Sequence, residues 1–148
     1  MKKKAALALG GVSMAAALVG LGAAPASALT YGKLINTSTG FCLDGDGAKI
    51  YPSKCNGGNY QQWAFEKKAN GYYRLKQSAT LKCLDANVDG KVRMNPCNDG
   101  TYQEFSLSQN TYGYQIRSRK WNKCLDMNSS PAIYTHACNT GNYQRWHR

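Results

Sequence analysis

The sequence predicts an all-β protein, first from its local patterning. Short segments alternate apolar with polar residues, as in KLIN from Lys33, YRLKQ from Tyr73 and YQIRSR from Tyr114. This period of two is typical of half-buried strands. Between them lie turn-forming phrases such as GDGA from Gly45 and NVDG from Asn87, in which Gly and Asn tolerate a positive φ. Beyond residue 28, no window has the 3.6-residue periodicity of a helix.

The second observation is that the chain repeats itself three times. The tripeptide CLD recurs at intervals of 41 residues, at Cys42, Cys83 and Cys124. A large aromatic closes each unit, at Trp63, Phe105 and Trp146. One such unit cannot bury its own apolar side, so we expect the three to share a core around a pseudo-threefold axis. A propeller is excluded because it needs at least four blades and carries its own signatures.

The first 28 residues are interpreted as a secretory signal peptide. A basic start, MKKK, precedes an apolar run of small residues, and ASA at Ala26 to Ala28 has the character of a cleavage site. A membrane anchor is the alternative, but the run is rich in Gly and Ala and ends without a charged stop. We therefore expect a secreted, extracellular protein whose mature part, residues 29–148, is one domain.

All six cysteines lie in the predicted mature part, which indicates a disulfide framework in an exported chain. Six cysteines allow 15 pairings, and one arrangement treats the three units alike and locally. It pairs Cys42 with Cys55, Cys83 with Cys97, and Cys124 with Cys138. A zinc site is disfavoured because there is no closely spaced cysteine pair and the only histidines are His136 and His147.

The chain is basic, with 19 Lys and Arg against 8 Asp and Glu. Removal of Lys2, Lys3 and Lys4 with the signal would leave 16 against 8, a net charge of +8. Such a charge permits association with polyanions but mostly concerns solubility. Lys67 and Lys68 stand beside turn residues and are expected on a solvated face.

The threefold pattern of CLD, a second Cys and then Q-x-W resembles the ricin-type β-trefoil lectins, a family of carbohydrate-binding modules. The resemblance covers residues 29–148 and implies a six-stranded barrel capped by three hairpins. The implied repeats are about 29–71, 72–113 and 114–148, each able to carry a shallow sugar pocket. Within this pattern we interpret Trp63, Phe105 and Trp146 as core, although Phe105 departs from the family's Trp. Gln61, Gln103 and Gln144 would hold backbone groups that the turns leave unpaired.

A finer resemblance points to the pocket residues. Tyr stands before each of these glutamines, where most ricin-type repeats have Asn, and this is similar to a group of small secreted lectins in the family that bind terminal α-mannose. That resemblance assigns Asp, Tyr, Asn and a second Tyr to each pocket. The matching residues are Asp44, Tyr51, Asn56 and Tyr60 in the first repeat, Asp85, Asn98 and Tyr102 in the second, and Asp126, Tyr134, Asn139 and Tyr143 in the third.

These residue types suit a sugar without a metal or other cofactor. A carboxylate accepts from two vicinal hydroxyls, an amide both donates and accepts, and the C–H face of a pyranose packs on a tyrosine ring. In the second repeat Arg93 replaces the first Tyr, so we expect that pocket to be weak, altered or inactive. Asp44 and Tyr51 are seven positions apart, whereas Asp126 and Tyr134 are eight apart, which leaves the geometry of the first pocket open.

Other functions stay open at this point. The Asp and Asn residues also suit purely structural turns, and in that case the domain is a scaffold for a protein partner or a polyanion. Nucleic-acid binding would be recognised by a steep salt dependence. A glycoside hydrolase needs two neighbouring carboxylates, but Asp44, Asp85 and Asp126 are equivalent residues of different repeats, and Asp46 is interpreted as a turn residue. We expect no enzymatic activity and no membrane insertion, and expect a monomer.

Overall fold

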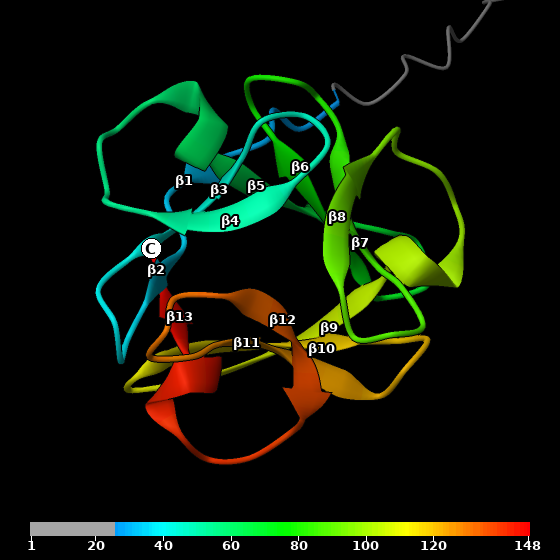
Figure 1. Ribbon diagram of the computed structural model, residues 1–148. Coiled ribbons are helices and arrows are strands. Elements are labelled where there is room, and N and C mark those ends of the chain that lie inside the picture. Colours follow the sequence, from blue (N-terminus) through cyan, green and yellow to red (C-terminus); the bar gives the residue numbers. More distant parts are fainter. Residues whose placement is uncertain (1–25) are drawn as a thin grey trace, which may run out of the picture.

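The computed structural model describes residues 26–148 and is built from strands, with three single 3-10 turns (Figure 1). The first repeat contains β1 (Tyr31–Gly32), β2 (Ile35–Asn36), β3 (Cys42–Gly45), β4 (Ile50–Ser53) and β5 (Trp63–Lys67). The second contains β6 (Tyr73–Gln77), β7 (Cys83–Ala86), β8 (Val92–Asn95) and β9 (Phe105–Asn110). The third contains β10 (Gly113–Ser118), β11 (Lys123–Met127), β12 (Ile133–Ala137) and β13 (Trp146–His147). The all-β prediction is confirmed.

A closed ring of antiparallel strands forms the barrel. Hydrogen-bonded neighbours run in the order β1, β5, β6, β9, β10, β13 and β2. Because β1 and β2 are consecutive segments of residues 31–36, their pairing with β5 and β13 respectively closes the ring. Three hairpins, β3–β4, β7–β8 and β11–β12, cap the barrel around a pseudo-threefold axis (Figure 1). This is the β-trefoil architecture.

The hairpins are joined to one another, but not in an equivalent way. The backbone N–H of Met94 donates to Ala48 O at 3.0 Å, and that of Thr135 donates to Gly90 O at 2.6 Å. The residue at the corresponding place in β4 is Pro52, which lacks the N–H needed for a third bond. The junction between the first and third hairpins therefore lacks a hydrogen bond that the other two junctions have.

Apolar residues from all three repeats fill the barrel. Trp63, Phe105 and Trp146 are fully buried and pack with Leu34, Leu75 and Ile116 and with the leucine of each CLD. The indole N–H of Trp63 donates to Leu43 O at 2.9 Å, and that of Trp146 donates to Leu125 O at 3.1 Å. Phe105 keeps the aromatic packing but lacks an N–H donor.

Three disulfides staple the repeats in the predicted pairs, Cys42–Cys55, Cys83–Cys97 and Cys124–Cys138. Each joins the first strand of a cap hairpin to the loop after its second strand. In the chain-entropy model, a bridge that closes a loop of this size contributes about 3 kcal/mol. Three such bridges indicate an oxidising, extracellular-type environment.

One expectation about surface charge was wrong. Lys67 is exposed, but the side chain of Lys68 is only 13% exposed and donates to Glu104 Oε1 at 2.6 Å. Asn70 donates to the same oxygen at 2.8 Å, and Arg119 pairs with the other. Glu104 is 1% exposed, so its charge needs these partners, which come from different loops of the fold.

The predicted signal peptide falls almost entirely outside the described residues, of which only Ala26–Ala28 belong to it. From residue 26 onward, the structure contains no helix with the length and apolar character needed to cross a bilayer.

Candidate functional site

Each cap hairpin places a buried Asp carboxylate opposite a side chain of the second strand, which is Tyr in the first and third repeats and Arg in the second. Asp44 faces Tyr51 across β3–β4, and Asp126 faces Tyr134 across β11–β12. In the second hairpin, Asp85 faces Arg93. The shorter spacing in the first repeat does not shift this register, because the missing residue is taken up in the turn between β3 and β4. In that turn, Asp46 accepts the N–H groups of Ala48 and Lys49.

The glutamine of each repeat fixes the carboxylate. Gln61 Nε2 donates to Asp44 Oδ2 at 2.8 Å and to Lys54 O at 2.9 Å, while its Oε1 accepts the N–H of Asn56 at 2.9 Å. Asp44 Oδ1 accepts the N–H of Gly45 at 2.7 Å. Gln61 is fully buried and Asp44 is 5% exposed, so the carboxylate is held in one position with a small part of it reaching the surface.

The third repeat reproduces the contacts of the glutamine, and the second has a looser version of them. Gln144 Nε2 donates to Asp126 Oδ2 at 2.9 Å, but the distance from Gln103 Nε2 to Asp85 Oδ2 is 3.4 Å. In both repeats the glutamine also bonds a backbone carbonyl and an asparagine N–H. These glutamines therefore hold the predicted pocket Asp as well as the backbone groups that the sequence indicated.

The asparagine behind each second cysteine sits in a tight turn. Its Oδ1 accepts the N–H of the glycine two residues later, at 2.7 Å from Gly58 to Asn56, and the second and third repeats have the same bond. A Cβ on Gly58 would lie 3.0 Å from that oxygen, which explains why the phrases CNGG, CNDG and CNTG keep Gly at this place. The amide nitrogens of Asn56 and Asn139 have no recorded partner within residues 26–148 and can donate to a ligand.

The first and third repeats each have one tyrosine on the hairpin, Tyr51 or Tyr134, and every repeat has one on its 3-10 turn. Tyr60, Tyr102 and Tyr143 lie on the 3-10 turns Asn59–Gln61, Thr101–Gln103 and Asn142–Gln144, and at least 40% of each is exposed. Burial raises the pKa of Tyr51, and the charges of Asp44 and Asp46 and the proximity of Tyr60 raise it further. Burial also raises the pKa of Tyr134, together with the carboxylate of Asp126. Each of these two tyrosines thus lies within electrostatic reach of its pocket carboxylate.

Arg93 changes the second site. Its Nε lies 3.4 Å from Asp85 Oδ1, so both carboxylate oxygens of Asp85 have protein partners. The side chain of Arg93 is 54% exposed. The tyrosine face present in the other two repeats is absent at this position, and a cation stands in its place.

Sequence reasoning missed Trp121, which approaches the second site from the third repeat. Its indole N–H donates to Ala86 O at 2.9 Å, and its ring packs edge-to-face on Tyr102 with centroids 5.7 Å apart. The position three residues before each CLD holds Thr39, Thr80 and Trp121. The single Trp among two Thr residues indicates that this position differs in the third repeat. It does not indicate that the Trp contacts the second repeat.

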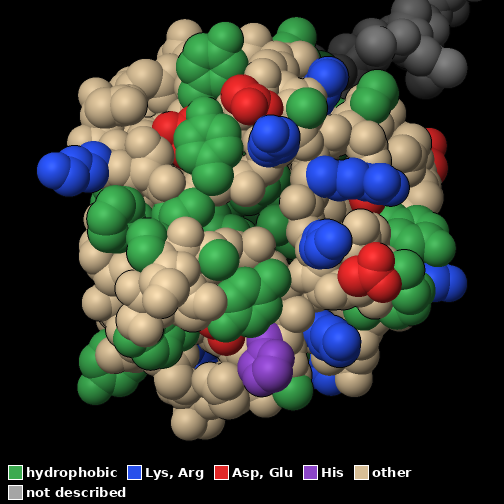
Figure 2. Space-filling model, in the orientation of Figure 1, with side chains coloured by type: hydrophobic (Ala, Val, Ile, Leu, Met, Phe, Trp, Pro, Cys, Tyr) green, Lys and Arg blue, Asp and Glu red, His purple; other side chains and the backbone are tan. Residues whose placement is uncertain are grey.

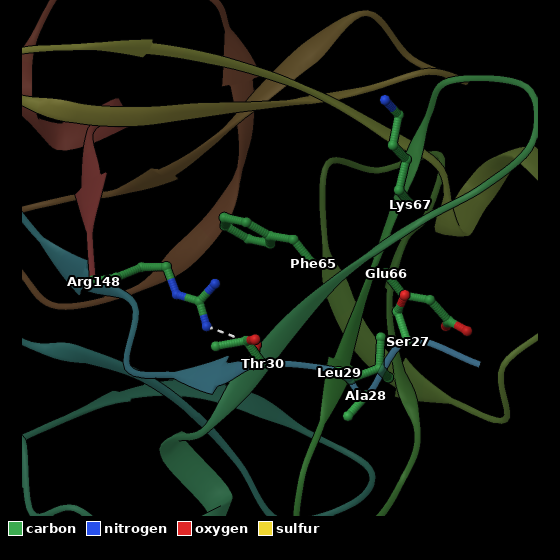
Figure 3. A pocket seen from close by; sticks show the side chains of 8 residues that line it. All are labelled: Ser27, Ala28, Leu29, Thr30, Phe65, Glu66, Lys67 and Arg148. Atoms are coloured by element: carbon green, nitrogen blue, oxygen red, sulfur yellow. Dashed lines mark hydrogen bonds between the residues drawn. The ribbon is translucent and has the colours of Figure 1, made fainter. Parts of the chain in front are cut away.

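A separate cavity of about 450 Å³ lies beside β1 and β5 (Figure 3). Arg148 reaches into this region, donating to Thr30 O at 3.0 Å and lying over the Phe65 ring at 5.1 Å. Ser27 and Ala28, at the predicted cleavage site, form part of its wall. None of its lining residues belongs to the three hairpin sites.

The sites contain no constellation suited to a metal. Within residues 26–148, His, Cys, Asp and Glu side chains nowhere gather in threes with a geometry that would hold an ion. The chemistry on offer is hydrogen bonding by fixed carboxylates and amides beside aromatic rings. Such a set recognises polar ligands that also have an apolar face.

The β-trefoil fold with three stapled hairpins is that of a family of carbohydrate-binding modules. Residues 30–146 match the family model described as the ricin-type beta-trefoil lectin domain. The chain belongs to this family, and carbohydrate binding is the function that the domain indicates. No curated protein sequence matches the chain.

Solved structures show the same fold. The designed threefold-symmetric protein ThreeFoil is 27% identical with a TM-score of 0.72, covering 79% of this chain and 96% of its own. The Rhizoctonia solani agglutinin is 23% identical with a TM-score of 0.65, and the match covers 84% of this chain and 97% of the agglutinin. An exo-beta-1,3-galactanase from Clostridium thermocellum is 25% identical with a TM-score of 0.72 over 82% of this chain, which spans only 30% of that enzyme.

Proposed function

We propose that this protein is a secreted lectin that binds terminal α-mannose of high-mannose glycans through its first and third repeats. One observation carries the proposal. In both hairpins the strand register sets a buried Asp directly opposite a Tyr, at Asp44 with Tyr51 and at Asp126 with Tyr134. A turn needs an Asp or an Asn, but it does not need this tyrosine.

The chemistry of each site fits a pyranose. The Asp oxygens accept from neighbouring sugar hydroxyls, and the Asn amide nitrogen donates to another hydroxyl. The two tyrosines offer ring faces to the C–H surface of the sugar and hydroxyls to its rim. The pocket Asp does not have to be reorganised on binding, because Gln61 or Gln144 already holds it.

The choice of mannose rests on the resemblance to actinohivin, a small secreted lectin whose pockets use the same four residue types. Tyr60 and Tyr143, directly before the glutamines, carry that resemblance. We infer that the protein acts without catalysis, because the equivalent carboxylates of the repeats stand on separate hairpins (Figure 1) and hydrolysis of a glycoside requires two of them across one bond.

A glycan array tests the proposal, with oxidised protein comprising residues 29–148 at low and high salt. We expect binding to structures that end in α-mannose, little changed by salt, because neutral sugars release no counterions. The double variant Asp44→Asn and Asp126→Asn replaces one acceptor in each site by a donor and should abolish this signal. Asp46→Asn is the matched control, since Asn also accepts the turn N–H groups that Asp46 accepts.

Two results would overturn the proposal. Absence of any mannose-dependent signal in a folded, disulfide-bonded protein would leave the hairpin residues with a structural role only. Equal loss in the double variant and in Asp46→Asn would show that the sites act through charge and not through geometry. Binding to an unrelated protein without competition by free mannose would favour a scaffold function.

A further inference from the structure

The second site is rebuilt rather than degenerate. Both of its new features are anchored to consecutive residues of β7. Arg93 pairs with Asp85 from the opposite strand, and Trp121 from the third repeat bonds Ala86 O. Both replaced side chains therefore contact β7, although they come from different repeats.

An aromatic platform is present in this site despite the loss of the hairpin tyrosine. Tyr102 and Trp121 form an edge-to-face pair. Tyr102 is 41% exposed and Trp121 is half-buried, whereas Trp63 and Trp146 are fully buried. The corresponding positions Thr39 and Thr80 offer no ring. The platform can support the C–H face of a pyranose as a tyrosine does elsewhere in the fold.

Two cations belong to this site, Lys120 over the ring pair and Arg93 on β8 opposite Asp85. The Nζ of Lys120 lies 5.6 Å from the ring centroids of both Tyr102 and Trp121. Arg93 is held through its Nε, and no partner is recorded within residues 26–148 for its two terminal nitrogens. Lys49 of the neighbouring hairpin is bridged to Arg93 through the backbone. Figure 2 shows Lys and Arg side chains gathered over the β7–β8 side of this face.

The acidic groups nearby do not cancel this charge. Asp85 is paired with Arg93 and is 4% exposed. Asp99 lies within ion-pair distance of Lys68 and Arg74, which belong to the neighbouring loop and strand. Asp89, in the β7–β8 turn, is an exposed acid of this lobe. The site therefore offers an exposed guanidinium beside Asp85 and an ammonium over the ring pair.

We propose that the second repeat binds an acidic sugar, a pyranose that bears a carboxylate or a sulfate ester, with its ring on Tyr102 and Trp121 and its anion on Arg93 and Lys120. A guanidinium with free terminal nitrogens binds a planar carboxylate or a sulfate through paired hydrogen bonds. A neutral mannose would not use these donors, and at this position it would meet the guanidinium of Arg93 in place of the tyrosine ring of the other two sites. The proposal extends the proposed lectin function to a second ligand class but does not require the mannose sites to be active.

The indole of Trp121 provides a direct readout. Its N–H resonance can be followed by NMR in oxidised protein comprising residues 29–148, during separate titrations with a galacturonate tetramer, a sulfated galactose disaccharide, and mannobiose. We expect the acidic probes to shift the Trp121 signal and mannobiose to leave it unchanged. The probe with the larger effect identifies carboxylate or sulfate as the preferred anion.

Variants assign the interaction to its residues. Arg93→Gln should weaken binding of the acidic probe by about tenfold or more, because it removes a charge-assisted pair of hydrogen bonds. Lys120→Gln should weaken it several-fold. Trp121→Thr restores the residue type of the other repeats and should abolish binding of the acidic probe, because it removes the platform. Since this variant has no Trp121 signal, its binding is followed through the backbone amide resonances of β7. Arg117→Gln is the charge-matched control, since Arg117 is the exposed residue of β10, and it should have no effect.

The proposal is overturned if neither acidic probe shifts Trp121, or if Arg93→Gln and Arg117→Gln weaken binding equally, which would indicate diffuse attraction to the basic surface. Equal affinity for a short single-stranded oligonucleotide would also overturn it in favour of general polyanion binding. The double variant Asp44→Asn and Asp126→Asn separates the two proposals. It should abolish mannose binding and leave the acidic probe's effect on Trp121 intact.

Discussion

Single buried glutamines couple the core of this protein to its surface sites. Gln144 bonds the carboxylate of Asp126, the carbonyl of Ala137 and the N–H of Asn139, and it is fully buried. If Gln144 is replaced by an apolar residue, each of these three groups loses a hydrogen bond. The glutamine of the Q-x-W pattern is therefore a positioning residue for the site as well as a structural one.

Replacing this glutamine should cost much more than replacing its neighbour of the same type. We expect Gln144→Met to lower the free energy of unfolding by on the order of 3 kcal/mol, because the buried carboxylate of Asp126 and two part-buried backbone groups lose their partner. Gln62→Met should change it by less than about 0.5 kcal/mol, since Gln62 is half-buried and makes no recorded side-chain bond within residues 26–148. Urea unfolding of both variants measures the difference. Equal effects would contradict the assigned role.

At the scale of elements, the close approach of β10 to β13 depends on one glycine. Gly113 begins β10 with a φ of 118°, and a Cβ there would lie 2.5 Å from Trp146 O. We expect Gly113→Ala to destabilise the protein by about 3 kcal/mol, through backbone strain and displacement of β13.

Gly71→Ala is the control, because its φ of 86° is also positive but nothing lies within 4 Å of the Cβ that alanine would add. Its cost should be about 1 kcal/mol, from strain alone. Thermal unfolding of the two variants compares them, and equal shifts would rule out the clash.

The ion network around Glu104 links the loops that follow β5 and β10 to the start of β9. Burial alone would raise the pKa of Glu104, but the bonds from Lys68, Arg119 and Asn70 outweigh it and lower that pKa from 4.5 to about 2. A carboxyl group with a lowered folded-state pKa stabilises the fold above its unfolded pKa, and the stabilisation is lost as the pH falls. The network should therefore weaken between about pH 5 and pH 2, with a loss of about 3 kcal/mol.

Substitution separates this contribution from general acid unfolding. Glu104→Gln should be less stable than wild type at pH 7 and should show a flatter decline of stability below pH 5. Glu66→Gln, which removes a half-buried partner of Arg74, should keep the wild-type slope. Urea midpoints measured from pH 7 to pH 2 give the comparison. A wild-type slope in Glu104→Gln would contradict the lowered pKa.

At the scale of the whole molecule, symmetry explains which features the sequence predicted. The disulfide pairs and the shared core follow from equivalence of the three repeats, whereas the all-β class follows from the alternation within each repeat, and the structure agrees with these predictions. The missed features break that equivalence. Lys68 is buried against Glu104, whose counterparts are Gln62 and Arg145, and Trp121 contacts a repeat other than its own. Such contacts depend on which loops meet in space, and a repeat alignment carries no information about that.

The arrangement of sites also decides how strongly the molecule would hold a dense glycan. A single shallow site of the proposed kind binds a monosaccharide with a Kd around the millimolar scale, about −4 kcal/mol. The first and third hairpins hold their sites on one rigid barrel (Figure 1), so the second contact is made at a high effective concentration. Two contacts can then raise avidity by about 10² to 10⁴ when the glycan spacing fits.

Removing one of the two sites should therefore cost far more than half of the binding. We expect Asp126→Asn to reduce avidity for a mannose-coated surface by at least about tenfold, measured by surface plasmon resonance, because the loss converts divalent into monovalent attachment. In solution, the same variant should bind one free mannobiose per chain instead of two, with unchanged affinity at the remaining site. Asp44→Asn should behave in the same way, since Asp44 and Asp126 have matching partners. A loss of only about twofold on the surface would mean that the sites bind independently, and the rigid barrel would then have no role in avidity.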